Sequence, residues 1–249
     1  MQPINKADLH IHTTYSDGTA SVPDVLTAVA QSDLRVIAIT DHDTIQGALE
    51  ARSLASEFGV EVIVGEEVST QEGHLLALFV EDELPPYRPA AETIDAVHAQ
   101  GGLCIAAHPY DWATSSLGYT WGRSHRLAAE VDHPWHTWRV DGLEVFNASL
   151  LWPRSACNLK AQHVAHTLGL PALGGSDAHS PATVGSGYTL FPGSTADDLY
   201  RAIKNKTVRW GGAGWSTRQV LELSWISVKQ RSVRGALAWA LADLLMLKG

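Results

Sequence analysis

Asp8-Leu9-His10-Ile11-His12, with Asp17 close behind, stands where the first apolar segment of the chain ends. Side chains on a strand point alternately to opposite faces, so Asp8, His10 and His12 share one face of the predicted strand. Two imidazoles side by side can hold a divalent cation. Such pairs also occur as ordinary surface or core histidines, so the interpretation depends on what stands at the ends of the other predicted strands.

Short apolar segments alternate with helical patterns along the chain. The predicted strands cover 4–9, 35–40, 60–64, 73–79, 103–107, 141–146, 171–175, 188–191 and 208–211, and the predicted helices cover 21–32, 45–58, 90–100, 153–168 and 196–204. Continuous apolar runs such as 35–40 are typical of strands buried on both faces of a parallel sheet. The alternation predicts the α/β class with a largely parallel sheet, in which functional side chains gather at the carboxyl ends of the strands.

Composition restricts the class of protein. The 249 residues fit one large domain or two small ones, and a hydrophobic content of 45% is ordinary for a globular protein. The formal charge of −9 argues against a broad basic surface for nucleic acid, although bound cations can reverse the sign locally. The chain begins without a signal-peptide pattern and has no apolar run of membrane-spanning length, so we expect a cytoplasmic protein that does not enter a membrane.

Two segments depart from the alternation. Residues 109–140 carry four tryptophans without clear periodicity, which is typical of a lid or binding loop, and a peripheral subdomain packed on its tryptophans is the alternative. Residues 216–249 are predicted to be largely helical and to pack on their own domain or on a second copy of the chain. The predicted organisation is a domain of residues 1–215, with 109–140 inserted as a candidate lid, followed by a helical tail over 216–249 that is a candidate homo-oligomer contact.

Nitrogen and oxygen donors stand at or near the ends of most of the predicted strands. They are His10, His12, Asp17, His42, Glu67, His74, His108, Asp177 and His179. The set contains no thiolate, and imidazole mixed with carboxylate suits manganese, iron or zinc in a catalytic site. Nine donors exceed the needs of one ion, so we expect two or three divalent ions that share a carboxylate. The chemistry predicted is metal-assisted hydrolysis, with a phosphate ester as the leading substrate class.

Four motifs in consistent order resemble the polymerase and histidinol phosphatase (PHP) family. They are Asp8-Leu9-His10-Ile11-His12 with Ser16-Asp17-Gly18, Thr40-Asp41-His42-Asp43, Glu67 with His108-Pro109, and Ser176-Asp177-Ala178-His179. The segment Glu67-Val68-Ser69-Thr70, followed by Gly73-His74-Leu75-Leu76, resembles the short stand-alone phosphoesterases of that family. The resemblance implies a distorted seven-stranded (β/α) barrel, TIM-like in form, with a three-metal centre at the carboxyl ends of its strands.

The resemblance also implies how the ions share the donors. The first ion would take His10, His12, Glu67 and Asp177; the second would take Glu67, His74 and His108, with Glu67 bridging; the third would take Asp17, His42 and His179. The implied catalytic residues are Glu67, Asp177 and His179. Glu66 is a rival for Glu67, but strand alternation places the two on opposite faces and the motif position favours Glu67.

Residues close to the donors are predicted to support them. Asp8, Asp41 and Asp43 are candidate acceptors for the outward N–H groups of the ligand imidazoles, and each could equally cap a loop or remain solvated. Arginine commonly binds phosphate, and a polar residue at a strand end can face the same site. The substrate-binding candidates are Arg123, Arg126, Arg154 and Asn147.

The leading functional prediction is a metal-dependent phosphoesterase that hydrolyses a small phosphate ester, a nucleotide or another phosphorylated metabolite, by a metal-bound hydroxide. The acidic charge favours a small molecule over nucleic acid, except for the end of a short oligonucleotide. Hydrolysis of a carboxyl or carbamate ester, and exonuclease action at a 3′ or 5′ end, are the alternatives. A metal-stabilised regulatory domain would show a degraded donor set, whereas every position of the set is filled here.

Overall fold

The computed structural model describes residues 3–118, 135 and 138–222 of the chain. The chain divides into two compact units, Met1–Trp215 and Ser216–Gly249, and every element named below belongs to the first. Among the described residues, no helix combines the length and the apolar character needed to cross a lipid bilayer.

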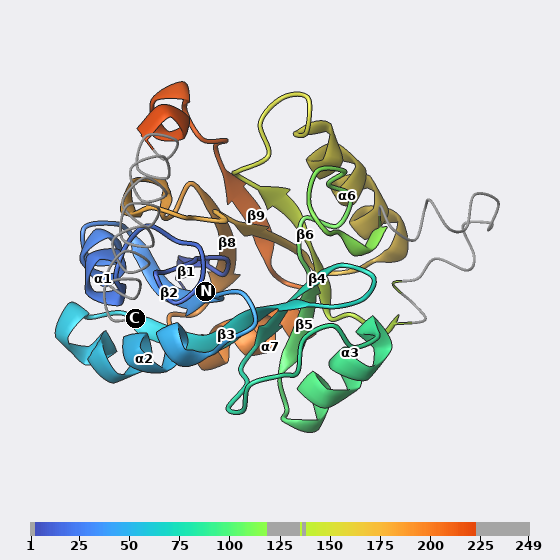
Figure 1. The fold of residues 1–249 in the computed structure, drawn as a ribbon, viewed down its shortest axis with the longest axis horizontal. Coiled ribbons are helices and arrows are strands. Elements are labelled where there is room, and N and C mark those ends of the chain that lie inside the picture. The colour runs from blue at the N-terminus through green and yellow to red at the C-terminus, as the bar shows by residue number, and fades with distance from the viewer. Residues whose placement is uncertain (1–2, 119–134, 136–137, 223–249) are drawn as a thin grey trace, which may run out of the picture. The chain divides into compact units, whose positions relative to one another are not determined.

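Strands and helices alternate through the first unit (Figure 1). The strands are β1 (Ile4–Asp8), β2 (Leu34–Ile39), β3 (Glu61–Ser69), β4 (His74–Leu78), β5 (Leu103–Ala106), β6 (Gly142–Asn147), β7 (Ala172–Gly175), β8 (Gly187–Pro192) and β9 (Arg209–Gly212). The helices are α1 (Val22–Ala30), α2 (Gln46–Phe58), α3 (Ala90–Ala99), α6 (Ala156–Leu168), α7 (Ala196–Lys204) and the short 3-10 helix η2 (Pro181–Thr183). Each strand and helix predicted within residues 1–215 has a counterpart, and most of the helical tail predicted over 216–249 lies outside the described residues. β3 differs most, because it continues to Ser69 instead of ending at Val64.

One sheet of nine strands has the order β7-β6-β5-β4-β3-β2-β1-β8-β9. The pairs β1–β2, β2–β3, β5–β6 and β6–β7 are parallel, and the pairs β3–β4, β4–β5, β1–β8 and β8–β9 are antiparallel. The sheet is therefore mixed, and the prediction of a largely parallel sheet holds only for two groups of three strands. The connection between Ser69 and His74 is too short for a crossover, which makes β4 antiparallel to β3.

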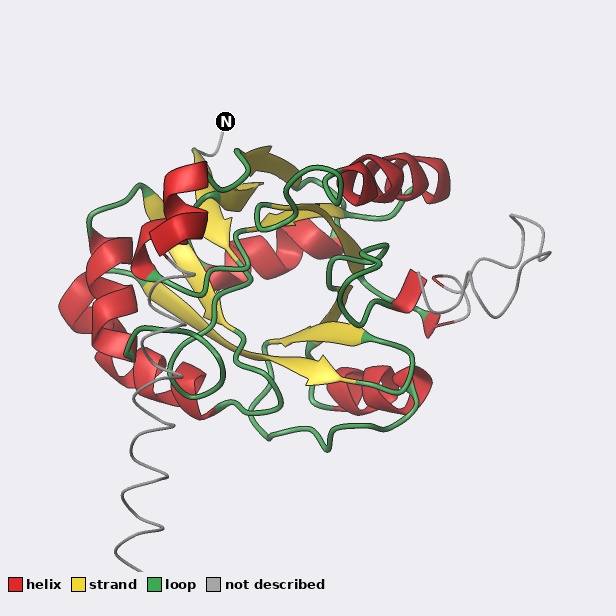
Figure 2. Cartoon of the chain, turned by 45° about the horizontal axis from the view of Figure 1, so that its top comes forward, coloured by secondary structure: helices red, strands yellow, loops and turns green. Residues whose placement is uncertain are grey.

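The two ends of the sheet approach each other, so the strands form a nearly closed barrel (Figure 2). Beyond β1 and β7, Ile11 and Ala178 form a parallel bridge, in which the amide of His12 donates to the carbonyl of Ala178 at 2.8 Å. Lower in the barrel, the Thr189 hydroxyl joins β8 to β7 through the amide and carbonyl of Gly174, both at 3.0 Å. The predicted distorted barrel is confirmed, with β8 and β9 present beyond the seven strands that the resemblance implies.

The barrel interior is apolar towards the amino ends of the strands. Inward-facing side chains of the strands form an apolar cluster with Leu199, Ala202 and Ile203 of α7. At its first residue, α7 is tied to the start of β3, because the amide of Ala196 donates to a carboxylate oxygen of Glu61 at 2.6 Å. A second apolar cluster packs the other helices against the outside of the sheet. Since α7 fills one end (Figure 1), the side chains that follow the carboxyl ends of the strands lie at the other.

Candidate metal centre

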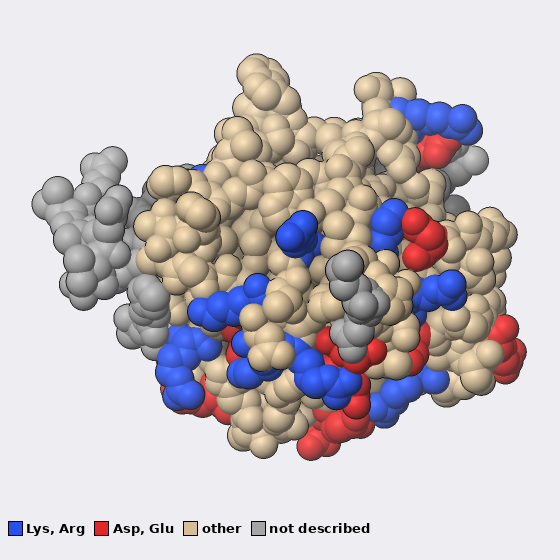
Figure 3. All heavy atoms as spheres, turned by 180° about the vertical axis from the view of Figure 1, so that it is seen from behind, with Lys and Arg blue, Asp and Glu red and all other residues tan. Residues whose placement is uncertain are grey.

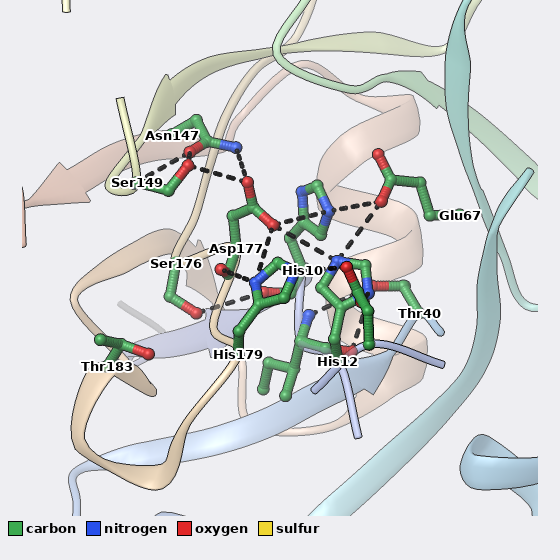
Figure 4. Close-up of polar contacts among 12 residues, drawn as sticks. His10, His12, Thr40, Glu67, Asn147, Ser149, Ser176, Asp177, His179 and Thr183 are labelled. Atoms are coloured by element: carbon green, nitrogen blue, oxygen red, sulfur yellow. Dashed lines mark hydrogen bonds and ion pairs between the residues drawn. The ribbon is translucent and has the colours of Figure 1, made fainter. Parts of the chain in front are cut away.

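His10 and His12 follow directly after β1 and are completely buried. Nε2 of His10 lies 3.2 Å from Glu67 Oε2 and 3.5 Å from Asp177 Oδ1, and Nε2 of His12 lies 3.3 Å from each of the same two oxygens (Figure 4). Neither Nε2 atom is satisfied by a hydrogen bond. Buried polar atoms are normally hydrogen-bonded, so ring nitrogens that converge on carboxylate oxygens without such bonds fit a divalent cation.

Glu67 presents its two carboxylate oxygens to two different groups of histidines. Oε1 lies 2.9 Å from Nδ1 of His74 and 2.9 Å from Nε2 of His108. Oε2 faces the two histidines after β1 and lies 3.3 Å from Nδ1 of His42. Because Glu67 lies on β3 between the groups, its position suits a carboxylate shared by two ions.

Asp17, His42 and His179 form the group nearest to solvent. Oδ2 of Asp17 lies 3.1 Å from Nε2 of His179 and 3.8 Å from Nε2 of His42. Nδ1 of His179 is 2.9 Å from the backbone carbonyl of Asp177, to which it can donate, and this leaves Nε2 directed at Asp17. The side chain of Asp17 is 53% exposed, so a solute can reach the cluster from this side.

The structure thus brings all nine predicted donors together at the carboxyl end of the barrel. Their donor atoms fall into four groups whose members all lie within 4.8 Å of one another: His10, His12 and Glu67; His10, His108 and Asp177; His12, Asp17 and His179; and His42, Glu67 and His74. The donors are imidazole nitrogens and carboxylate oxygens, which fits manganese, iron or zinc.

The charges in this cluster act strongly on one another. Burial by itself raises the pKa of Glu67 and of Asp177, but the surrounding histidines outweigh it and hold both pKa values well below their usual range. Burial also disfavours the charged form of His179, whereas the carboxylates of Asp17 and Asp177 raise its pKa to about 9. Both buried carboxylates are therefore ionised at neutral pH and can compensate positive charge brought into the cluster.

Glu66 points away from the cluster, as strand alternation predicts. Its Oε1 accepts a hydrogen bond from the amide of Leu84 at 2.8 Å, and its Oε2 is buried without a hydrogen-bond partner. Burial, assisted by nearby carboxylates, raises the pKa of Glu66 to about 8. The geometry therefore agrees with the preference for Glu67.

The three aspartates predicted to accept from ligand imidazoles have a different role. Asp8 accepts from two backbone amides of the 176–185 segment, at 3.0 and 2.8 Å. Asp41 accepts from the amide and the hydroxyl of Thr13, and Asp43 accepts from the amide of Ser69, all at 2.7 Å. Loop amides just beyond a strand lack ladder partners, and short acidic side chains satisfy them readily. Of the roles left open for them, these contacts agree with the loop role and not with acceptance from the ligand imidazoles: the residues fix the loops that carry the donors.

The acceptor for a ligand imidazole is Glu144, which the sequence analysis missed. Its Oε1 lies 2.9 Å from Nδ1 of His10, and both side chains are buried. Glu144 is the single acid within the apolar run Leu143-Glu144-Val145-Phe146 of β6. A lone acid in a buried strand needs a specific partner, and this signal could have identified it.

The predicted substrate-binding residues lie in different settings. Asn147 is completely buried, and its side-chain nitrogen and oxygen are both hydrogen-bonded inside the protein, so it does not face a substrate. Arg154 makes a two-pronged ion pair with the buried Asp111, with its Nε at 2.9 Å from Oδ1. Arg123 and Arg126, like most of the predicted lid at 109–140, lie outside the described residues. A substrate contact by Arg154 stays a prediction.

The sequence matches the PHP domain family over residues 8–134, about half of the chain, and the PHP-associated family over residues 156–208. The chain belongs to the PHP family. The two matched regions contain all nine donors of the cluster. The predicted membership is confirmed, and at the level of the family so is the predicted class, a metal-dependent phosphoric ester hydrolase.

Relatives of this PHP protein differ in what their names say they act on. An uncharacterized protein of Methanocaldococcus jannaschii is 39% identical over 154 residues, which cover 57% of this chain and 82% of the relative. The phosphoribosyl 1,2-cyclic phosphate 1,2-diphosphodiesterase of Eggerthella lenta is 37% identical over 37% of this chain and 38% of that enzyme. The 5′-3′ exoribonuclease of Haemophilus influenzae is 45% identical over 26% of this chain and 24% of that enzyme. The matches span less than half of either named enzyme.

The fold is also found in a solved structure. A two-domain protein of Bacteroides vulgatus, described as containing a predicted PHP-like metal-dependent phosphoesterase, superimposes with a TM-score of 0.69 at 20% identity. The superposition covers 85% of this chain and 66% of that protein. At this level of identity the likeness establishes the barrel fold and nothing further.

Proposed function

We propose that this PHP protein hydrolyses a phosphate ester of a small molecule, with two to three divalent transition-metal ions as its cofactor. The observation that carries the proposal is the position of Glu67, whose two carboxylate oxygens face separate sets of histidine nitrogens in a buried cluster. Such an arrangement holds neighbouring cations around one shared carboxylate.

We assign the donors to the ions as the resemblance implies; the four groups found in the structure share members with these sets but do not coincide with them. His10, His12, Glu67 and Asp177 would hold the first ion; Glu67, His74 and His108 the second; Asp17, His42 and His179 the third. Manganese, iron and zinc all suit these donors. When bound, such ions supply activation of a water molecule and neutralise negative charge on a phosphoryl group.

Three residues are proposed to be catalytic. The low pKa values of Glu67 and Asp177 keep these carboxylates ionised, which fixes the negative charge of the inner cluster. His179 lies on the more exposed side, with 21% of its side chain accessible, and its ring is oriented by Asp17 and by the backbone of Asp177. As a donor to the third ion it would place that ion beside the substrate; with Nε2 on the ion and Nδ1–H on the carbonyl of Asp177, its ring has no proton left, so the proton for the leaving oxygen would come from water at the site.

The net charge of −9 supports a small substrate over a nucleic acid, and the amino end of the barrel shows no compensating basic surface among the described residues. Lys and Arg side chains on the face shown in Figure 3 lie among Asp and Glu side chains and do not form an unbroken basic surface. Several basic side chains at the amino end of the barrel are paired with acids, as Lys204 is with Asp141 at 3.1 Å. An extended nucleic acid needs many unpaired cations along its path, whereas a small phosphate ester needs only the cations of the site.

The test is a substrate panel run on protein purified without chelator. Elemental analysis should find more than one transition-metal ion per chain. A phosphomonoester, a cyclic phosphodiester, a short oligonucleotide and an aryl carboxylic ester are then assayed in parallel. We expect the small phosphate esters to be hydrolysed fastest. Preference for the oligonucleotide would support the exonuclease alternative, and preference for the aryl ester would support carboxyl ester hydrolysis.

Two variants and one control test whether the cluster is required for hydrolysis. His42→Ala and Asp177→Ala should abolish hydrolysis while the circular dichroism spectrum is retained. His163→Ala removes an exposed histidine of α6, away from the cluster, and should leave the rate unchanged. Hydrolysis that persists in both cluster variants would show that the assignment of the donors is wrong.

A further inference from the structure

We propose that Glu144 is a positioning residue, through which strand β6 orients donors that come from three other parts of the barrel. β6 itself contributes no side chain to the four donor groups found among the described residues. Its side chains nevertheless contact His10 after β1, His108 after β5 and Asp177 after β7. The inference rests on the proposed function, because it assigns these contacts to the metal centre.

The first contact fixes the ring of His10. Oε1 of Glu144 accepts from Nδ1–H of His10 at 2.9 Å, with 1% and 0% of the two side chains exposed. A carboxylate accepts but does not donate, so Nδ1 must carry the hydrogen in the metal-binding form of the ring. The lone pair of that form is then on Nε2, which faces Glu67 and Asp177.

The second contact fixes the backbone that carries His108. Oε2 of Glu144 accepts from the amide of His108 at 2.7 Å. At His108 the backbone has a φ of +27°, a conformation that costs roughly 1–3 kcal/mol in a residue with a side chain. The hydrogen bond to Glu144 helps to hold this conformation, in which Nε2 of His108 lies 2.9 Å from Oε1 of Glu67.

The third contact passes through Asn147 to Asp177. Oε2 of Glu144 accepts from Nδ2 of Asn147 at 3.0 Å, and the same nitrogen donates to Oδ2 of Asp177 at 3.2 Å. The hydroxyl of Ser149 also donates to Oδ2 of Asp177, at 2.8 Å (Figure 4). With Oδ2 occupied, Oδ1 of Asp177 is the oxygen that faces the rings of His10 and His12.

Glutamine cannot replace Glu144 in this arrangement. Glu144 accepts at both oxygens, from His10 on one side and from His108 and Asn147 on the other. One end of a glutamine amide is an NH₂ group, which can only donate. In one orientation that NH₂ meets the two donors at Oε2, and in the other it forces the hydrogen of His10 onto Nε2, where an ion must bind.

The chain contains a matched control for this substitution. Asp141, immediately before β6, accepts from Nε2 of His98 at 2.8 Å and from the amide of Cys104 at 3.0 Å. It therefore makes the same kinds of contact as Glu144, to one histidine ring and one backbone amide. It differs in its place, since it lies at the amino end of β6 with Lys204 of α7.

The experiment titrates metal-free protein with Zn²⁺ in competition with a chromophoric chelator and follows urea unfolding of the same samples. Wild type should bind more than one Zn²⁺. Glu144→Gln should weaken binding at one site by about 10- to 100-fold, and Glu144→Asp, which keeps two acceptor oxygens, should recover part of this loss. Asp141→Asn should lower the urea midpoint but leave Zn²⁺ binding within about twofold of wild type, as expected for a contact that only stabilises the fold.

Each alternative outcome has a separate meaning. Folded Glu144→Gln that binds Zn²⁺ like wild type would overturn the positioning role and leave the proposed function intact. Equal loss of Zn²⁺ binding in Asp141→Asn would overturn it too, since the effect would be general. Wild type that binds no Zn²⁺ would overturn the proposed function itself. If Glu144→Gln does not fold, Asn147→Ala is used, because it removes the link from Glu144 to Asp177; it should weaken one Zn²⁺ site several-fold, and unchanged binding contradicts the proposal.

Discussion

Glu67 Oε1 lies 2.9 Å from Nε2 of His108, although the two residues are 41 positions apart in the chain. Both side chains are polar and almost completely buried, which costs free energy unless each has a specific partner. Contact between them joins the carboxyl ends of β3 and β5, on either side of β4. The relationship makes Glu67 the residue on which most of the cluster depends.

Replacement of Glu67 by glutamine should therefore remove more than one ion. The amide keeps the shape but loses the charge and one acceptor oxygen, so one group of histidines loses its oxygen partner and the other keeps only an uncharged one. We expect metal content to fall by more than one ion per chain and hydrolysis to fall by at least about 100-fold. Elemental analysis and initial rates check this, and a variant that keeps its full metal content would contradict the bridging role.

Removal of metal should destabilise the fold as well as stop hydrolysis. Ions that bind only the folded state stabilise it, by about 2.7 kcal/mol at a concentration 100 times Kd, which corresponds to roughly 5–10 °C for a chain of this size. Thermal unfolding with and without chelator measures the shift. Manganese or zinc added back should restore both properties, and identical melting curves would show that the cluster does not hold ions.

Glu66 should make stability depend on pH. Burial raises its folded-state pKa from 4.5 to about 8, so between these values the folded protein keeps a proton that the unfolded chain releases. The contribution of Glu66 to the free energy of unfolding therefore decreases as pH rises through this window. Glu66→Gln has no proton to lose and should be more stable than wild type near pH 9 but similar near pH 4. Urea unfolding of the metal-free proteins at both pH values tests this, and an equal effect at both would contradict it.

Loss of Arg154 should leave Asp111 buried with its main partner gone. Asp111 is completely buried, and the side chain of Arg154 is 29% exposed, so we expect Arg154→Ala to cost about 2 kcal/mol, less than for a fully buried pair. Addition of Asp111→Asn should recover part of the loss, because the unpaired charge is removed. Urea unfolding of the single and double variants measures the coupling, and strictly additive costs would argue against the pair.

Gly175 should not tolerate a side chain. A Cβ atom at this position would lie 2.4 Å from Oε1 of Glu144 and 2.8 Å from Cβ of His10. Gly175→Ala should therefore push these two residues apart and lower Zn²⁺ affinity by about 10-fold or more. Gly169→Ala is the control, since nothing lies within 4 Å of a Cβ there; its left-handed backbone makes it cost stability without changing Zn²⁺ binding. Similar Zn²⁺ binding by both variants would contradict the prediction.

Much of the fold and all nine donors could be predicted from the sequence because they are local features. Apolar runs give the strands, and the donors follow those runs within a few residues, as His42 follows β2. The length of β3 was harder, because Glu66 and Glu67 resemble a loop until both are known to be buried. Charged residues in a segment favour the prediction of a loop, and this prediction fails when tertiary contacts pair the charges inside the protein.

The contacts around the donors could not be predicted because they join distant parts of the chain. Glu144 and His10 are 134 positions apart, and only the register of the closed barrel brings them together. For Asp41 and Asp43, adjacency to His42 left a ring contact and a loop contact equally open, and in the structure both accept from backbone amides of neighbouring loops. Adjacency in sequence indicates proximity, and the choice of partner depends on which donors the folded loops leave unpaired.

The bridge between Ile11 and Ala178 gives barrel closure and the metal centre a common origin. The residues on either side of this bridge are His10 and His12 in the segment after β1 and Asp177 and His179 in the segment after β7. A nascent chain that has not yet reached Ala178 therefore lacks both this join of the barrel and a complete set of donors. Cations bound between the two segments would also hold this join closed, so closure of the barrel and assembly of the metal centre would depend on each other.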